Sequence, residues 1–309
     1  MDLYKKNNIY SIKKNIFRYF FLGMGVIGGV YFATIFWMYQ EQDTIRHQEW
    51  EVMIATVFHH HIEASTKNLE VILRILSRNP ALQQHFLAKD RPALLEETRA
   101  FGSLLNQDYD ITHFYFHTLE MENFLRVHRP NLYGDTIHRL TLRQAAKNGI
   151  TSGLELGPLG TLTLRVVMPW YVEQKRIGYL ELGMELSNML TIFEQFDNID
   201  GYLLTADKKH IDQQGWEQGM AMLGRPTNWS ALPDNVVLFD KLPKKFKHHD
   251  QKGYKGFLHK ALPYMVSFHM TYNQPITDLS GQQIGNLLLA HDELKQLLLA
   301  RKVTNIFLL

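Results

Sequence analysis

The chain has 309 residues, no cysteine and a formal net charge of +2, and 45% of its residues are apolar. This composition is typical of a folded chain and excludes a disulfide framework, thiolate zinc sites and cysteine nucleophiles. The first forty residues hold five of the 33 basic and one of the 31 acidic side chains, and the remaining 28 and 30 provide no basic field for nucleic acid.

The N-terminal region predicts a membrane anchor. Residues 19–39 contain no charged side chain and are long enough for one helical crossing of a bilayer. Five basic residues precede this run and Glu41 and Asp43 follow it, so residues 1–18 are expected in the cytoplasm and the rest outside. A cleavable signal peptide is the competing interpretation, but the apolar run is longer than such peptides have and no small-residue cleavage site follows it.

Helices are expected to follow the membrane segment, in a region of stalk and covering helices at 40–106. Apolar residues recur with helical spacing from Glu41 to Asn79, which predicts one long amphipathic helix that ends before Pro80. Shorter helices are predicted at 80–88 and 92–105, the second capped by Asp90.

The period then changes to two, which indicates strands. A first module at 107–190 is expected to contain strand pairs at 111–117 and 124–128 and at 161–168 and 177–184, with a helix at 140–147 between the pairs. The second pair is expected to be joined through Pro169 and the polar residues 173–176. Helices first and an antiparallel sheet afterwards predict an α+β fold.

The sequence partly repeats. Residues 169–186 align loosely with 275–294, because each has a proline, a polar turn, an Ile-Gly pair, an apolar strand and an acid. A second module at 191–300 is therefore predicted, with further strands at 201–206, 236–239 and 264–272 and a helix at 292–302. Residues 301–309 are interpreted as the start of a truncated second transmembrane helix, because this apolar run is too short to span.

This arrangement resembles the double Cache sensors, the paired PAS-like extracytoplasmic domains of bacterial receptors, and most closely their third subgroup. The resemblance covers about residues 41–300 and is carried by FLRVHRP at 124–130, YGD at 133–135, GLE at 153–155, LRVV at 164–167 with Pro169, and IGYLE at 177–181. It implies a small extracellular ligand, a homodimer and a signal that passes along the long helices.

The alternation in the strands predicts one polar face in the first module. Arg126, His128, Arg165, Tyr179 and Glu181 fall on that face, since side chains alternate across a strand. The predicted ligand-binding residues are Tyr115, Arg126, His128, Asp135, Glu155, Arg165, Tyr179 and Glu181.

Two interpretations of the polar face stay open. Its two arginines could capture a carboxylate, with an acid that holds an amine, as in an amino-acid-like ligand. Alternatively Arg126 and Arg165 pair internally with Glu155 and Glu181 and lock the strands. The loop at 129–135 is either a lid over this face or an ordinary connection.

Other groups of polar residues in the sequence do not indicate a metal site or a catalytic site. Residues 59–61 are three successive histidines near Glu63, but successive helix positions point in different directions and cannot converge on one metal ion. His248 and His249 lie in a lysine-rich stretch that reads as an exposed loop. No nucleophile elbow, phosphate loop or dinucleotide fingerprint is present, so we expect no enzyme, no metal and no cofactor.

The sequence therefore predicts a periplasmic small-molecule sensor anchored in the bacterial inner membrane. The receptor would be a histidine kinase, a diguanylate cyclase or a chemoreceptor whose output region lies outside this chain. A membrane-anchored periplasmic enzyme and a protein-interaction scaffold are the alternatives.

Overall fold

The structure, a computed structural model, describes residues 2–197, 199–243 and 269–292. The chain divides into two units, residues 1–57 and 58–309. Helix α1 (Asp2–Ser77) is continuous through both units, and its segment Ile16–Met38 is long and apolar enough to cross a membrane. The predicted apolar helix at 19–39 overlaps this segment over residues 19–38.

Two capped turns lead from α1 into α2 (Pro80–Leu87) and α3 (Arg91–Tyr109). The side-chain oxygen of Asn79 accepts hydrogen bonds from two N–H groups in the first turn of α2, and Asp90 does the same once for α3. Asp110 ends α3 in the left-handed region, with φ at 56°. The predicted helix boundaries at Asn79 and Asp90 are confirmed.

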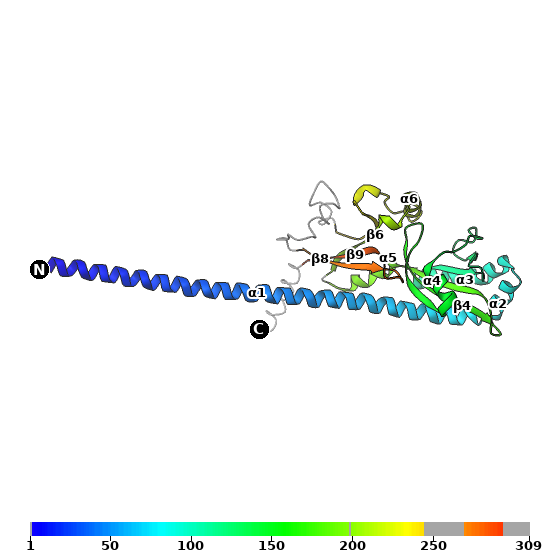
Figure 1. The fold of residues 1–309 in the computed structure, drawn as a ribbon, viewed down its shortest axis with the longest axis horizontal. Helices are drawn as coiled ribbons and strands as arrows, with labels where there is room; N and C mark the ends of the chain where they lie inside the picture. The colour runs from blue at the N-terminus through cyan, green and yellow to red at the C-terminus, as the bar shows by residue number, and fades with distance from the viewer. Residues whose placement is uncertain (1, 198, 244–268, 293–309) are drawn as a thin grey trace. The chain divides into compact units, whose positions relative to one another are not determined.

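Residues 111–185 form a five-stranded antiparallel sheet with the order β2-β1-β5-β4-β3. The strands are β1 (Ile111–His117), β2 (Asn123–Arg126), β3 (Thr151–Leu156), β4 (Leu162–Val172) and β5 (Lys175–Glu185), and α4 (Leu140–Asn148) separates β2 from β3. Figure 1 shows α3 and α4 beside this sheet. All four predicted strands are present; β3 is an edge strand that we did not predict.

The expectation that the chain leaves the sheet at Pro169 is wrong. Strand β4 continues through Pro169 to Val172, and a two-residue turn at Glu173 and Gln174 follows, both with positive φ. Proline is tolerated here because β3 pairs with β4 only as far as Val167, which leaves β4 an edge strand on that side.

The two faces of the first sheet differ as the alternation predicts. One face is apolar and buries Phe116, Leu164, Leu180 and Leu182, each at most 1% exposed. Phe86 of α2 packs against this face, with ring centroids 4.9 Å from Trp170 and 6.3 Å from Phe116. The opposite face carries the polar residues.

A four-stranded antiparallel sheet follows, with the order β7-β6-β9-β8. Short helices α5 (Leu186–Met189) and η1 (Leu190–Gln195) lead into β6 (Ile199–Asp207), η2 (Lys208–His210), α6 (Gln213–Met222), η3 (Trp229–Ala231), β7 (Asn235–Asp240), β8 (His269–Thr277) and β9 (Gln283–Asp292). Two antiparallel sheets with preceding helices confirm the α+β expectation (Figure 1).

The internal repeat is reproduced in the strand register. Pro169 lies opposite Tyr179, the residue after Gly178, and Pro275 lies opposite Asn286, the residue after Gly285. The last hairpin of each sheet is therefore built on one plan.

Glycines permit close contact between the β3–β4 turn (residues 157–161) and α6. A Cβ at Gly160 would overlap the ring of Trp216, and a Cβ at Gly219 would overlap the carbonyl oxygen of Leu159. We call this contact the junction. It fixes the first sheet against the second module.

Several predictions fall outside the described residues. These are the loop at 248–249, the first part of the strand at 264–272, the C-terminal helix beyond 292 and the segment 301–309.

Candidate functional site

Glu181 lies at the centre of the polar face of the first sheet. Its Oε1 accepts hydrogen bonds from Nη1 of Arg139 at 2.7 Å and of Arg165 at 2.5 Å, and its Oε2 accepts one from His117 Nε2 at 2.9 Å. Burial opposes the ionisation of Glu181, but Arg139, Arg165 and His117 together hold its pKa well below the usual range. Glu181 is therefore an ionised anchor for three side chains.

Glu155 joins β3 to the first turn of α4. Its two oxygens accept hydrogen bonds from the backbone N–H of Thr141 at 2.8 Å and from the Thr141 hydroxyl at 3.0 Å. Glu155 also lies 3.6 Å from Nε of Arg165. A carboxylate at a helix N-terminus stabilises the helix. The contacts of Glu155 with Thr141 and Arg165 therefore support a structural role for this residue.

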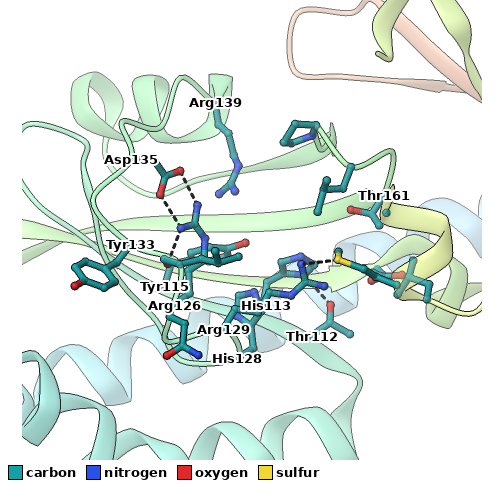
Figure 2. A pocket seen from close by; sticks show the side chains of 18 residues that line it. Thr112, His113, Tyr115, Arg126, His128, Arg129, Tyr133, Asp135, Arg139 and Thr161 are labelled. Carbon is teal, nitrogen blue, oxygen red and sulfur yellow. Dashed lines mark hydrogen bonds and ion pairs between the residues drawn. The ribbon is translucent and has the colours of Figure 1, made fainter. Parts of the chain in front are cut away.

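Arg126 and Asp135 form a bidentate ion pair at the edge of the sheet. The two nitrogen–oxygen distances are 2.6 and 2.7 Å, and Arg126 Nη1 also donates to the carbonyl of Leu132 at 2.7 Å. The hydrogen bond from Arg126 lowers the pKa of Asp135. Figure 2 shows this pair with Arg139 pointing toward it from the other side.

A cavity of about 450 Å³ opens in front of the ion pair. Its walls come from β1, β2 and the loop at 129–135, from the β3–β4 turn and from α6; among the lining residues are Tyr115, Arg126, His128, Arg129, Asp135, Arg139, Leu159 and Met222 (Figure 2). This volume is within the range of small-molecule sites. Asn131 to Tyr133, from the loop interpreted as either a lid or an ordinary connection, thus form part of its wall.

Tyr115 is the aromatic floor of this cavity. Its ring lies 4.9 Å from the guanidinium of Arg139, 5.6 Å from that of Arg126 and 5.8 Å from that of Arg165. Cations above an aromatic face are attracted to it, so Tyr115 holds the three arginines near one another.

Two histidines of the cavity are held neutral. The ring of His128 accepts a hydrogen bond from the backbone N–H of Phe114 at its Nδ1, 3.3 Å away. His128 remains partly exposed, but desolvation of its ring by the surrounding protein, together with Arg129 and Arg165, lowers the pKa of His128 to about 4. Burial and Arg165 place the pKa of His113 well below its usual value.

Arg129 differs from the other arginines of the cavity. Its Nη1 donates toward the sulfur of Met222 at 4.0 Å, and no ion pair joins it to a carboxylate among the described residues. Arg126, Arg139 and Arg165 each have such a partner. The cavity therefore presents one positive charge that the protein leaves uncompensated.

The structure separates the eight predicted site residues into two groups. Tyr115, Arg126, His128 and Asp135 line the cavity. Arg165 and Glu181 lie behind them, at most 2% exposed, and Glu155 is buried beside α4. Tyr179 packs in an apolar cluster with Ile137, Leu142 and Val167, so the structure does not bring it to the cavity.

The arginines of the polar face form ion pairs with carboxylates of the protein, but one of the partners differs from the prediction. Arg165 contacts both Glu155 and Glu181, as that interpretation requires, whereas Arg126 pairs with Asp135. Sequence reasoning missed Arg129, Arg139 and His113. The alternation in β1 places His113 on the face of Tyr115, but nothing in the local pattern indicates that Arg139, just before α4, turns back to Glu181.

The histidine run in α1 has ordinary helical neighbours. His60 lies 3.8 Å from Glu63, and Glu63 accepts a hydrogen bond from Lys67 at 2.8 Å. Within the described residues, no group of three or more His, Cys, Asp or Glu side chains has a geometry for metal binding.

Comparison with known proteins gives a consistent result. Residues 50–232 match the family described as the double sensory domain of two-component sensor kinases (dCache_3). The periplasmic domain of Vibrio cholerae LuxQ is 11% identical, with 78% of this chain and 99% of that chain covered and a TM-score of 0.52, which shows a shared fold.

Two further solved structures are similar at lower TM-scores. The sensor domain of the V. cholerae histidine kinase DctB is 13% identical over 82% of this chain and 99% of that chain, with a TM-score of 0.47. The ligand-binding domain of the Pseudomonas fluorescens chemoreceptor CtaA, in complex with L-serine, is 13% identical over 80% and 99%, with a TM-score of 0.35. No curated protein matches this chain.

Proposed function

Because the chain belongs to the family of double sensory domains of two-component sensor kinases, we propose that it senses a small carboxylate-bearing molecule outside the cytoplasm. The ligand would occupy the cavity lined by Tyr115, Arg126 and Arg129. The receptor would be of the histidine-kinase type.

The uncompensated charge of Arg129 carries this proposal. A guanidinium in a recess gains most from an anion that can accept two parallel hydrogen bonds, and a carboxylate has that shape. The carboxylates of Asp135 and Glu181 are already committed to Arg126, Arg139 and Arg165. Glu185, which also lines the cavity, is paired with Arg225, so a ligand carboxylate would supply the anion for Arg129.

The other predicted residues would have distinct roles around this ligand. Arg126 and Tyr115 would form its contact surface, with Asp135 fixing the orientation of Arg126. His128, neutral at the pH of the periplasm, could donate a hydrogen bond from Nε2, since its Nδ1 accepts one from Phe114. Glu181 would position Arg139 and Arg165 behind the ligand.

A thermal-shift screen of the chain with acetate, succinate and L-glutamate tests the proposal, with succinamide as the uncharged counterpart of succinate. A ligand that binds only the folded state raises its stability. We expect at least one carboxylate to stabilise the protein and Arg129→Gln to weaken its affinity about tenfold or more, because a charge-assisted hydrogen bond is lost.

Arg99→Gln is the matched control, since Arg99 is exposed on α3 and pairs only loosely with Glu96, 3.8 Å away. It should leave the affinity unchanged. Stabilisation that persists in Arg129→Gln, or no stabilisation by any carboxylate, would overturn the proposed site. Turnover of a bound carboxylate would indicate an enzyme instead.

We also propose an inner-membrane location with residues 1–18 in the cytoplasm, the module at 107–190 distal and the module at 191–300 proximal to the membrane. The positive residues before the apolar segment support this orientation. Since the chain has no cysteine, single substitutions report it directly. A membrane-impermeant maleimide should label Lys67→Cys in intact cells and leave Ser11→Cys unlabelled; the reverse pattern would refute the orientation.

A homodimer is the final part of the proposal. Val71 and Ile75 lie four residues apart on α1 and are 56% and 66% exposed, which suits an apolar contact with a second copy. Ile75→Cys should form a disulfide-linked dimer under mild oxidation. Glu70→Cys, one residue before Val71 and therefore turned about 100° around the helix, is the comparison that should cross-link less.

A further inference from the structure

A second cavity, of about 720 Å³, lies on the other side of the Arg126–Asp135 ion pair. The first module contributes α4 and the end of β3 to its walls, and the second module contributes η2 and the turn between β8 and β9. Arg126, Asp135, Arg139 and Pro158 line both cavities, whereas the other lining residues of the second cavity do not line the first. The second cavity is therefore separate from the site described above.

The contacts that hold this cavity open are specific. Leu279, in the β8–β9 turn, packs directly onto Gly153 of β3, where any side chain at position 153 would overlap it. The turn is itself ordered by Asp278, whose Oδ1 accepts hydrogen bonds from the backbone N–H groups of Ser280 at 2.8 Å and Gln282 at 3.0 Å. The two walls are thus built of fixed elements.

The charges of the second cavity favour an anion. Its three carboxylates are committed within the protein: Asp135 to Arg126, Glu155 to Thr141 and Asp278 to its own turn. Arg143, exposed on α4, also lines the cavity, and no side-chain hydrogen bond or ion pair of Arg143 occurs among the described residues. The positive charge of Arg143 is left for a ligand.

The uncharged polar part of the lining suits hydroxyl groups. Ser280, Gln282, Thr136 and His138 present donors and acceptors toward the cavity from both modules. Ser280 donates its hydroxyl hydrogen to Asp278 at 2.6 Å, so its oxygen remains an acceptor for a ligand hydroxyl. No Phe, Tyr or Trp among the described residues lines this cavity, and the aliphatic side chains of Leu140, Leu156 and Ile284 would pack against the carbon chain of the ligand.

We propose that this second cavity binds a hydroxylated organic anion, with Arg143 on its carboxylate and the β8–β9 turn on its hydroxyls. The ligand would contact both modules at once. Arg126, Asp135, Arg139 and Pro158, which also line the first cavity, would lie beside it. The inference does not depend on which molecule occupies the first cavity.

Isothermal titration of the chain in detergent with D-gluconate tests this site, with D-sorbitol as the uncharged polyol and acetate as the anion without hydroxyls. We expect D-gluconate to bind more tightly than either. Arg143→Gln should weaken D-gluconate binding about tenfold or more, because one charged hydrogen-bonding partner is removed.

Lys147→Gln removes the same charge from the exposed surface of α4 one turn later, outside the lining of the cavity, and should leave D-gluconate binding unchanged. The proposal is overturned if D-gluconate does not bind, if sorbitol or acetate binds equally well, or if Arg143→Gln and Lys147→Gln have the same effect. Loss of gluconate binding in Arg129→Gln, with Arg143→Gln unaffected, would place the anion in the first cavity and also overturn it.

Discussion

Glu181 shows how one residue can decide the chemistry of a whole sheet face. Its carboxylate holds Arg139, Arg165 and His117 at once while being fully buried. A ligand amine cannot reach it without displacing one of these partners. The polar face is therefore a support for the cavity, and recognition is left to side chains in front of it.

Replacing Glu181 by Gln should destabilise the protein strongly. The change leaves Arg165 buried without a full counter-charge, and breaking a buried ion pair from one side costs about 3–5 kcal/mol. Urea unfolding of the chain in detergent measures this loss. Glu96→Gln, at an exposed position of α3, should change the free energy of unfolding by less than about 0.5 kcal/mol; equal losses in both variants would show that Glu181 is not an anchor.

The neutral histidines give the stability a definite pH dependence. The pKa of His128 is about 4 in the folded state and about 6.5 in an unfolded chain. Between these values the unfolded state binds more protons, so the free energy of unfolding should fall as the pH is lowered from 6.5 toward 4.

His128→Asn should reduce this pH dependence, because the asparagine oxygen can accept the Phe114 N–H without binding a proton. Unfolding measured at pH 7 and pH 5 gives the slope for each variant. A slope remains from His113 and His117, whose pKa values are lowered by burial. If His128→Asn kept the full slope, the folded His128 would have an ordinary pKa.

At the scale of elements, local patterns predicted four strands of the first sheet and both of their hairpin pairings, but neither strand β3 nor the pairing of β1 with β5. The alternation in β4 and β5 is strong because one face is fully apolar, and caps at Asn79 and Asp90 mark helix ends chemically. Strand β3 and helix α6 lack such patterns, since glycines and contacts distant in sequence determine their packing.

The candidate site shows the same limit. Alternation identified Arg126, His128 and Arg165 as sharing a face, and the structure agrees. It could not predict that α4 covers part of that face, which buries Tyr179 in an apolar cluster. Nor could it place Arg129 in a cavity completed by α6, because residues 129 and 222 meet only through the tertiary fold.

The junction between the β3–β4 turn and α6 should be sensitive to a single methyl group. Gly219→Ala would gain about 1 kcal/mol of helix propensity, but its Cβ would overlap the Leu159 carbonyl, and such overpacking costs about 1–3 kcal/mol. We expect a lower melting temperature and weaker binding in the first cavity, which Leu159 lines. Gln218→Ala, exposed on the same helix, should change neither; unaltered binding in Gly219→Ala would mean that the junction does not shape the cavity.

At the scale of the whole molecule, Arg225 connects the two sheets. It donates hydrogen bonds to Glu185 at 3.3 Å and Ser187 at 3.1 Å, where β5 passes into α5, and to the carbonyl of Leu238 in β7 at 3.2 Å. Glu185 also lines the first cavity. A displacement of Glu185 at the cavity wall can therefore be transmitted to β7 of the second sheet through the side chain of Arg225.

Arg225→Gln should loosen the second sheet while leaving the first intact. Hydrogen exchange measured by mass spectrometry should become faster in β7 and stay unchanged in β1, because the lost contacts lie between β5 and β7. Arg176→Gln removes a comparable contact, to the carbonyl of Ala146 at 2.8 Å, and should affect α4 instead. Equal exchange in β7 for the two variants would show that Arg225 does not couple the sheets.

The contact of Trp216 with Gly160 has a practical consequence. The indole is completely buried and lies 5.5 Å from the ring of Trp229. Separation of the β3–β4 turn from α6 would admit water to this ring and shift its fluorescence to longer wavelength. The emission wavelength of Trp216 should therefore report whether the β3–β4 turn and α6 are in contact. This intrinsic fluorescence can be followed in real time without an attached dye.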